Sequence, residues 1–198
     1  MVVQGVRSSD EVLAALRKCD LVLAAGRIEG KFPVVVVGGA AVIVGGFRPR
    51  VTMDVDVVQG VVGRFGLGDV LHQGGLHIVS ESVMTLHPDY MVNAIPMAGA
   101  EGFQVLDVKM LSPYDLAISK IGRGHDKDFS DAAAIVRKAH LDTGRLTELY
   151  NEAVEYWVGD EKWHRHRLQT FLGKLERGEL PVPGPEPSPV KRRGLTHP

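Results

Sequence analysis

The chain has 198 residues, a length that suits one domain or one domain with a small appendage. Hydrophobic residues make up 44% of it and charged residues 24%, so the composition is that of a globular protein. The formal net charge is −1 and there is one cysteine. These values exclude an internal disulfide and a uniformly basic surface, so any contact with nucleic acid must come from a local patch.

The chain shows no sign of a membrane-bound or exported protein. Its first ten residues lack the apolar core of a signal peptide. Its most hydrophobic run, residues 34–44, is too short to span a bilayer and is interrupted by glycines. We therefore expect a cytoplasmic protein with no membrane partner.

The first predicted element is a helix that begins at Ser8. Ser8 and Glu11 have the spacing of a capping box, in which each side chain binds a backbone N–H at the start of the helix. Apolar residues then recur at helical spacing, and Gly26 is a plausible end. These apolar positions are Val12, Leu16, Cys19 and Leu23.

A buried strand, a glycine turn and a short helix are predicted next. Four consecutive valines, residues 34–37, are typical of a strand that is buried on both faces. Gly38 and Gly39 allow a sharp turn and let a ligand approach the backbone. A short helix over residues 40–44 would then point its free N–H groups at an anion above the glycines.

The following stretch alternates apolar and acidic residues and predicts a second strand over residues 53–58. Side chains two positions apart in a strand share a face, so Asp54 and Asp56 should point the same way, about 6–7 Å apart at the backbone. Such a pair can hold one or two hard divalent cations, which prefer oxygen ligands. Taken singly, the glycine pair is also compatible with a simple turn, and the acidic pair with a solvated strand face.

In this order the two features resemble the signature of the DNA polymerase β-type nucleotidyltransferase fold. The run Arg50-Val51-Thr52-Met53-Asp54-Val55-Asp56 is similar to that of minimal nucleotidyltransferases allied to the AbiEii/MenT-type toxins. The resemblance covers about residues 30 to 140. It implies an α/β (α+β) fold, with a mixed sheet flanked by helices and a helical C-terminal part.

Further strands are predicted between residues 76 and 108. One begins at Leu76 and continues to about Leu86, a short one lies within residues 91–97, and another covers residues 102–108. A weak helix is predicted over residues 62–72. His87-Pro88-Asp89 should end the first of these strands, because proline has no N–H to donate to a neighbouring strand.

Four helices are predicted after residue 110. Ser112 should cap the first, with proline at its first position, and Asp128 should cap the second. The third should run from about Thr143 to Trp157 and the fourth from Asp160 to about residue 175. From residue 180 the chain is rich in proline and lacks apolar periodicity, which predicts a disordered tail. The expected organisation is a core over residues 1–140, helices packed on it over 141–179, and a tail over 180–198.

A second group of charged residues lies on the first two of these helices. Lys120 and Arg123 are three positions apart on one, and Asp128 and Asp131 are three apart on the next. By composition alone these residues favour a surface salt-bridge network between two helices. Their order resembles the second motif of AbiEii-like nucleotidyltransferases, a Pro-x-Asp-Leu helix carrying a lysine and followed by Lys/Arg-Asp-x-x-Asp. The resemblance implies that Lys120 acts on the triphosphate and that Asp128 orients Lys120 or Arg123, with Asp131 as a further candidate.

The resemblance thus assigns roles to residues of both motifs. It makes Asp54, Asp56, Lys120 and Asp128 the catalytic residues. It places the nucleotide at Gly38, Gly39, Arg50, Thr52 and Arg123, with Mg²⁺ or Mn²⁺ on Asp54 and Asp56. Related enzymes commonly use a third carboxylate from a later strand, for which Glu81 and Asp107 are both candidates.

The expected activity is metal-dependent transfer of a nucleoside monophosphate from an NTP. The resemblance implies an RNA (tRNA), protein or small-molecule acceptor, a toxin-like role, and a cognate antitoxin as a partner. The alternative is a catalytically inactive module with the same fold that binds a nucleotide or a partner. The ambiguity of the third carboxylate motivates that alternative.

Overall fold

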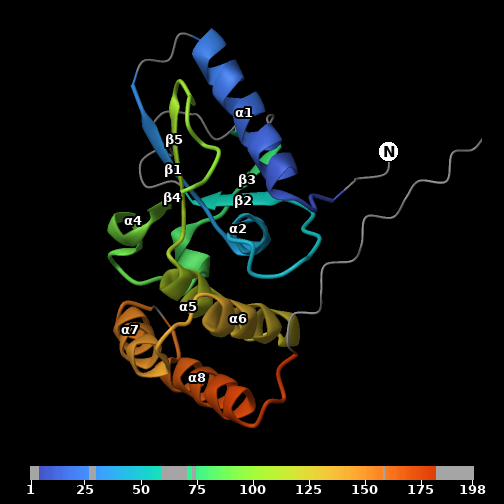
Figure 1. The fold of residues 1–198 in the computed structure, drawn as a ribbon. Helices are drawn as coiled ribbons and strands as arrows, with labels where there is room; N and C mark the ends of the chain where they lie inside the picture. The colour runs from blue at the N-terminus through green and yellow to red at the C-terminus, as the bar shows by residue number, and fades with distance from the viewer. Residues whose placement is uncertain (1–4, 27–29, 59–70, 73–74, 158, 182–198) are drawn as a thin grey trace, which may run out of the picture.

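The computed structural model describes residues 5–26, 30–58, 71–72, 75–157 and 159–181, and a mixed β-sheet lies at its centre (Figure 1). The strand order is β3-β2-β1-β5-β4. The central strand β1 runs parallel to β5 and antiparallel to β2, while β2 runs parallel to β3 and β4 antiparallel to β5. The strands are β1 (Phe32–Val36), β2 (Val55–Val58), β3 (Leu76–Ile78), β4 (Ile95–Pro96) and β5 (Leu106–Met110).

The central position of β1 follows from its sequence. Its valines are fully buried, and both of its edges pair with neighbouring strands. This confirms the prediction of a strand covered on both faces. A strand that pairs along both edges has a fixed position, so it also fixes the position of the next element. That element is α2 (Gly38–Val44), which begins with the two glycines.

Helices cover both ends of the sheet. Figure 1 shows α1 beside the strands at one end of the molecule and α5 to α8 stacked at the other, with α7 and α8 outermost. Among the described residues, no helix is both long and apolar enough to cross a lipid bilayer. The helices are α1 (Ser9–Ala25), α2, α4 (Tyr90–Asn93), α5 (Pro113–Arg123), α6 (Asp126–Lys138), α7 (Thr143–Glu155) and α8 (Glu161–Glu176), with a 3₁₀ turn η2 (Glu81–Val83).

The predicted starts of α1, α5, α7 and α8 are confirmed by capping side chains, and that of α6 is not. The Ser8 side chain accepts a hydrogen bond from the Glu11 N–H, and both halves of the capping box are present. The Ser112 hydroxyl accepts a hydrogen bond from the Asp115 N–H at the start of α5. The prediction for α6 is wrong by three residues, because its cap is His125, and Asp128 lies buried inside the helix.

Several predicted strand limits are also wrong. Strand β2 begins at Val55 instead of residue 53, because Thr52 pairs with Val6 and the chain bends between that bridge and the sheet. Strand β5 begins at Leu106 instead of 102, because the Asp20 carboxylate binds the N–H groups of residues 104–106. Residues 81–83 form a 3₁₀ turn in place of strand, and residues 90–93 form a helical turn before the two-residue β4.

The C-terminal helices share one hydrophobic core with the sheet. Leu146 and Tyr150 of α7 and Leu168 and Phe171 of α8 belong to the same buried cluster as the valines of β1. Leu180, the first residue of the predicted tail, is buried in that cluster too, so the packed part of the chain extends past the predicted boundary. Residues 182–198, and most of the weak helix predicted over 62–72, lie outside the described residues.

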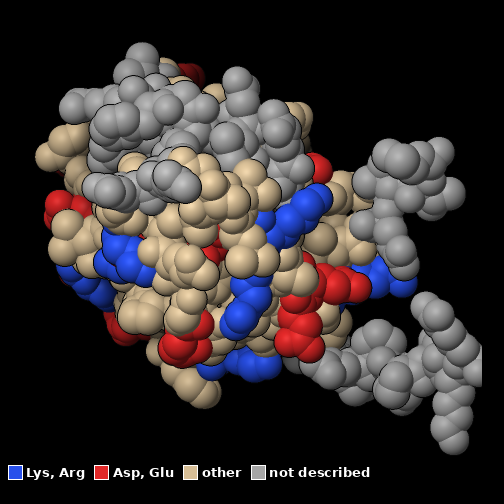
Figure 2. Space-filling model, turned by 90° about the horizontal axis from the view of Figure 1, so that it is seen from above, with Lys and Arg blue, Asp and Glu red and all other residues tan. Residues whose placement is uncertain are grey.

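Charges of both signs are mixed on the surface. Figure 2 shows one face of the molecule, on which the described Lys and Arg side chains lie between Asp and Glu side chains. No continuous basic surface is formed by the described residues of that face. This agrees with the net charge of −1, so any binding of a charged ligand depends on a local cluster of charges.

Candidate active site

A cavity of about 330 Å³ lies where β1 ends and α2 begins. We call it the Asp56 cavity. The backbone N–H of Val37 donates to the carbonyl of Asp56 at 3.0 Å, which sets the two motif segments side by side. The cavity is lined by Val37, Gly38, Asp56, His77, Val79, Val83, Met84 and Arg123.

The two glycines make room for polar side chains of the first motif. Gly38 has φ +63°, and a Cβ at that position would lie 2.5 Å from Oδ2 of Asp56. A Cβ on Gly39 would lie 2.6 Å from Oγ1 of Thr52 and 3.2 Å from Cζ of Arg50. The residues between these glycines and Asp56 therefore fold back over α2, and only glycine leaves them space.

Asp56 is held in place by a residue that the motif analysis did not single out. His77, on the neighbouring strand β3, pairs with Asp56 in the sheet register, and its Nδ1 lies 2.9 Å from Oδ1 of Asp56. One carboxylate oxygen thus faces the imidazole, and the other lies against Gly38. Both residues line the cavity, so the Asp56 carboxylate is partly oriented before any ligand arrives.

Asp54 has a different setting from Asp56. It lies in the bend before β2, and its side chain is exposed. It is outside the lining of the Asp56 cavity. Asp54 and Asp56 were predicted to point the same way because both were expected to lie in one strand. Since β2 begins at Val55, that argument does not apply to Asp54.

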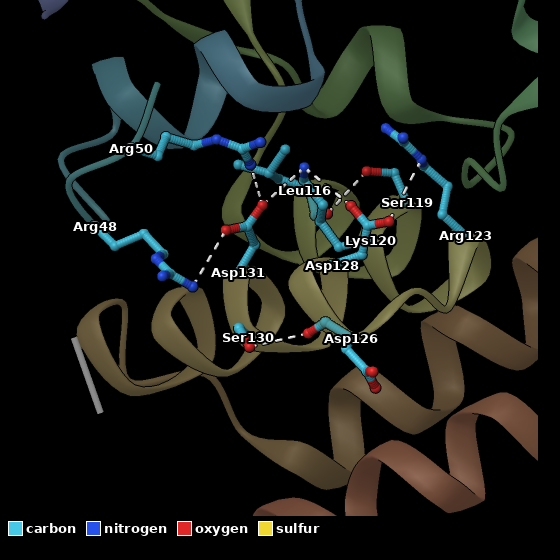
Figure 3. A network of polar contacts seen from close by, with 10 residues as sticks. All are labelled: Arg48, Arg50, Leu116, Ser119, Lys120, Arg123, Asp126, Asp128, Ser130 and Asp131. Carbon is cyan, nitrogen blue, oxygen red and sulfur yellow. Dashed lines mark hydrogen bonds and ion pairs between the residues drawn. The ribbon is translucent and has the colours of Figure 1, made fainter. Parts of the chain in front are cut away.

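The residues of the second motif form a buried charge network between α5 and α6 (Figure 3). Lys120 Nζ lies 3.0 Å from Oδ2 of Asp131 and 3.4 Å from Oδ1 of Asp128. Lys120 is 1% exposed, Asp128 0% and Asp131 3%. These residues therefore form a buried network, and not the surface salt-bridge network that composition alone favours.

Burial dominates the electrostatics of this lysine. Removal from water lowers the pKa of Lys120 below its ordinary value, and Arg50 acts in the same direction, while Asp131 and Asp128 oppose the shift. Two carboxylates around one ammonium keep the group compensated in the interior. Removing the lysine would leave both acids without that partner.

The network joins the two motifs. Arg50, from the first motif, donates to Oδ2 of Asp131, and Arg48 lies 3.5 Å from Oδ1 of the same carboxylate. At the other end, Nε of Arg123 lies 3.6 Å from Oδ2 of Asp128. Arg123 also lines the Asp56 cavity. A chain of alternating charges therefore runs from the loop after α2, through α6 and α5, to the cavity wall.

Neither candidate for the third carboxylate lines the Asp56 cavity. Glu81 lies in η2, lines a different cavity and accepts a hydrogen bond from the Tyr90 hydroxyl at 2.6 Å. Asp107 pairs with Pro33, four residues before the Val37 that bonds to Asp56, which places it about 13 Å along the sheet. It lines a separate cavity with Lys31.

The donor set limits how a metal ion could be held. Among the described residues, no three carboxylate, imidazole or thiol side chains converge on one point. A site made by the protein alone is therefore not formed there. One carboxylate fits Mg²⁺ when substrate phosphates and water supply the remaining oxygens, and Asp56 meets that requirement, whereas Asp54 lies outside the cavity lining.

A comparison with protein families shows to which family the chain belongs. A family model described as "Nucleotidyltransferase of unknown function (DUF6036)" matches residues 15–174. The chain belongs to this family. No curated protein and no solved structure matches the chain. The nucleotidyltransferase family predicted from the two motifs is confirmed, and its alliance with the AbiEii/MenT-type toxins stays a prediction.

Among the residues that line the Asp56 cavity, His77 is the polar residue that the sequence did not single out. Its strand was predicted from residue 76, but its pairing with β2 depends on contacts between segments that are distant in the chain. The one available signal was its place at the second position of that strand. A histidine there becomes informative once β3 is known to lie beside Asp56.

Proposed function

We propose that this nucleotidyltransferase moves a nucleoside monophosphate from an NTP to an acceptor hydroxyl, with pyrophosphate leaving. The observation that supports this most is the Asp56 cavity itself. One carboxylate of the first motif and one guanidinium of the second line it, next to a glycine that exposes backbone. Phosphate transfer needs these partners, because the substrate is highly charged and catalysis rests on positioning and electrostatic stabilisation.

Each group has a role in this proposal. Gly38 presents its backbone at the cavity, where the β- and γ-phosphates can approach it, and Arg123 neutralises their charge from the cavity wall. The resemblance implies a phosphate contact at Gly39 too, although the space beside Gly39 is taken by Thr52 and Arg50. Thr52 and Arg50 support the glycine turn from the other side. A Mg²⁺ or Mn²⁺ ion held by Asp56, with Asp54 as the second ligand that the resemblance implies, would supply positive charge at the phosphates.

We assign Lys120 a positioning role. The resemblance implied a direct contact with the triphosphate, but its ammonium lies between two buried carboxylates. From there it holds Asp128, which in turn pairs with Arg123 at the cavity. Lys120 therefore acts on the phosphates through Arg123.

The acceptor is proposed from the resemblance to the AbiEii/MenT-type enzymes. It is an RNA such as tRNA, a protein or a small molecule, and a cognate antitoxin would accompany a toxin-like activity. A second candidate function is nucleotide binding without transfer. It is favoured by one observation, that Asp56 is the only carboxylate among the described residues that line the Asp56 cavity.

A transfer assay separates the two functions. The protein is incubated with each α-labelled NTP, Mg²⁺ and total RNA, and the label is followed in RNA, in protein and in small molecules. We expect Asp56→Asn to lower turnover by about 10²-fold or more. Asp107→Asn removes the same charge outside the cavity and should leave turnover unchanged.

Binding is measured on the same samples. If the wild-type protein binds NTP but transfers no label to any acceptor or to itself, its function is nucleotide binding without transfer. If Asp56→Asn retains full turnover, the Asp56 cavity is not the active site.

A further inference from the structure

A second cavity, of about 340 Å³, lies beside the Asp56 cavity. It is formed by η2 and the residues after it, by α4, and by the C-terminal end of α7. Its volume falls within the range of small-molecule sites, about 300–1,000 Å³. We call it the aromatic cavity, after Tyr90, Tyr156 and Trp157, which line it with Glu81, Ser82 and Met84.

The two cavities are separated by a single turn of chain. Met84 lines both of them. Its neighbours divide between the two sides, with Val83 facing the Asp56 cavity and Ser82 the aromatic cavity. The two cavities therefore share a wall at Met84, and a ligand that spans both would cross the chain there.

The aromatic cavity offers flat apolar surface at its mouth. Tyr156, the residue after the end of α7, is 70% exposed, although its ring is large and apolar. The Trp157 ring is packed at 4.8 Å from the imidazole of His164, measured between ring centroids, and so is held from behind. Exposed aromatic rings beside a cavity are suited to stack on a planar heterocycle, since every nucleobase has a π-face.

One carboxylate in this cavity can read the edge of such a ring. Oε1 of Glu81 accepts a hydrogen bond from the Tyr90 hydroxyl at 2.6 Å, which fixes the carboxylate while lone pairs stay free. An ionised carboxylate only accepts hydrogen bonds. Of the common bases, guanine presents two adjacent N–H donors on one edge, whereas uracil presents a single N–H between two carbonyl oxygens.

We propose that the aromatic cavity binds the base of the nucleoside triphosphate whose phosphates lie in the Asp56 cavity, and that Glu81 favours guanine. This inference rests on the proposed function. It gives Glu81 a role in substrate choice, which agrees with its place outside the Asp56 cavity. It also makes α7 part of the nucleotide site.

Tryptophan fluorescence tests where the base binds. The chain has two tryptophans, so Trp163→Phe leaves Trp157 as the reporter. With Mg²⁺ present, GTP should change the fluorescence of Trp157, whereas inorganic tripolyphosphate should bind without changing it. A response of equal size to both ligands would show that the signal does not come from the base.

Tyr156 provides the affinity test. Tyr156→Ala should weaken GTP binding by about tenfold, as expected for the loss of one stacked ring. Tyr156→Phe keeps the ring and should bind GTP as the wild type does. Tripolyphosphate affinity should be the same in all three proteins, because its contacts lie in the Asp56 cavity.

Glu81 provides the specificity test. Glu81→Gln should weaken GTP binding by about tenfold and leave UTP binding nearly unchanged. Glu155→Gln, which alters an exposed carboxylate on α7 outside the cavity lining, should change neither affinity. Equal losses for GTP and UTP in Glu81→Gln would overturn the guanine preference.

The outcomes distinguish this inference from the function on which it rests. If Asp56→Asn weakens GTP binding but Tyr156→Ala does not, the aromatic cavity is not the base site, and the proposed function stands. If the wild-type protein binds neither NTP nor tripolyphosphate, both are overturned.

Discussion

At the scale of single residues, Gly38 shows how closely backbone and site are fitted together. It adopts a left-handed conformation, and a Cβ there would meet Oδ2 of Asp56 at 2.5 Å. The left-handed region costs a residue with a side chain about 1–2 kcal/mol, and the contact would in addition displace the carboxylate. Stability and function should therefore respond differently to a change at this position.

We predict that Gly38→Ala lowers the free energy of unfolding modestly but lowers NTP affinity and turnover as much as Asp56→Asn does. Gly178→Ala is the matched control, since Gly178 has φ +67° and open space where a Cβ would lie. Urea unfolding and the transfer assay measure the two effects. Equal activity in the two glycine variants would show that Asp56 can move aside without consequence.

The buried lysine gives a second prediction at this scale. Lys120→Met should lower the free energy of unfolding by about 3–5 kcal/mol, because two buried carboxylates lose their ammonium partner. Adding Asp128→Asn should restore part of the loss, since Asp131 still has Arg48 and Arg50. Urea unfolding measures both variants. A loss below about 1 kcal/mol in Lys120→Met would contradict the account of the network.

At the scale of elements, the packing of α8 on α7 depends on a buried histidine. The Tyr150 hydroxyl donates to the carbonyl of His164, and the imidazole lies between the rings of Trp157 and Trp163. Its Nε2 has no hydrogen-bond partner among the described residues. Burial, and then the nearby charge of Arg167, lower the pKa of His164 below its ordinary value.

A group with a lowered pKa in the folded state binds its proton more tightly when unfolded. The contribution of His164 to stability is therefore complete above its unfolded pKa, near pH 6.5, and is lost as the pH falls below that value. We predict that the stability of His164→Gln declines less steeply between pH 6.5 and pH 5 than that of the wild type. The difference in slope should be at most about 1.4 kcal/mol per pH unit. Identical slopes in urea unfolding would show that the histidine does not titrate in this range.

Elements whose limits are encoded locally could be predicted from the sequence. The capping box at Ser8, the proline start of α5 and the valine run of β1 carry their signals within a few residues. The start of β2 and the place of His77 could not be predicted in this way. They depend on Val6 pairing with Thr52 and on β3 lying beside β2, contacts that local periodicity does not contain.

The features of the candidate site also fall into those that local sequence signals predict and those that depend on distant contacts. Gly38, Asp56 and Arg123 were singled out by their motifs, and the structure brings them to one cavity, whereas Gly39 and Asp54 lie outside its lining. The depth of Lys120 could not be predicted, because its burial is set by how α5 packs on α2 and α6 and by the pairing of α6 with the loop after α2. A lysine and two acids at helical spacing have the same sequence pattern whether they are buried or exposed.

At the scale of the whole molecule, the C-terminal segment is still packed on the core at Leu180, where its composition predicted a disordered tail. Leu180 is buried in the core, and Arg137 donates to the carbonyls of Leu180 and Pro181. We predict that ending the chain after Pro181 leaves the melting temperature nearly unchanged. Ending it after Gly178 should cost about 1.5–3 kcal/mol from the lost leucine, and lower the melting temperature by several degrees. Thermal unfolding of both truncated proteins checks this, and equal melting temperatures would show that Leu180 contributes nothing.

The pairing of Arg50 with Asp131 has a consequence for how the protein is made. Arg50 and Asp131 are 81 positions apart, so a chain emerging from the ribosome presents Arg48, Arg50 and then Lys120 before either acid that compensates them. Until α6 has been synthesised, those three cations have no carboxylate partner from the network and cannot be drawn into a dry interior. A nascent or prematurely terminated chain that lacks α6 therefore cannot bury Lys120 with compensating charges, and the network that joins the two motifs forms only after the second motif has been synthesised.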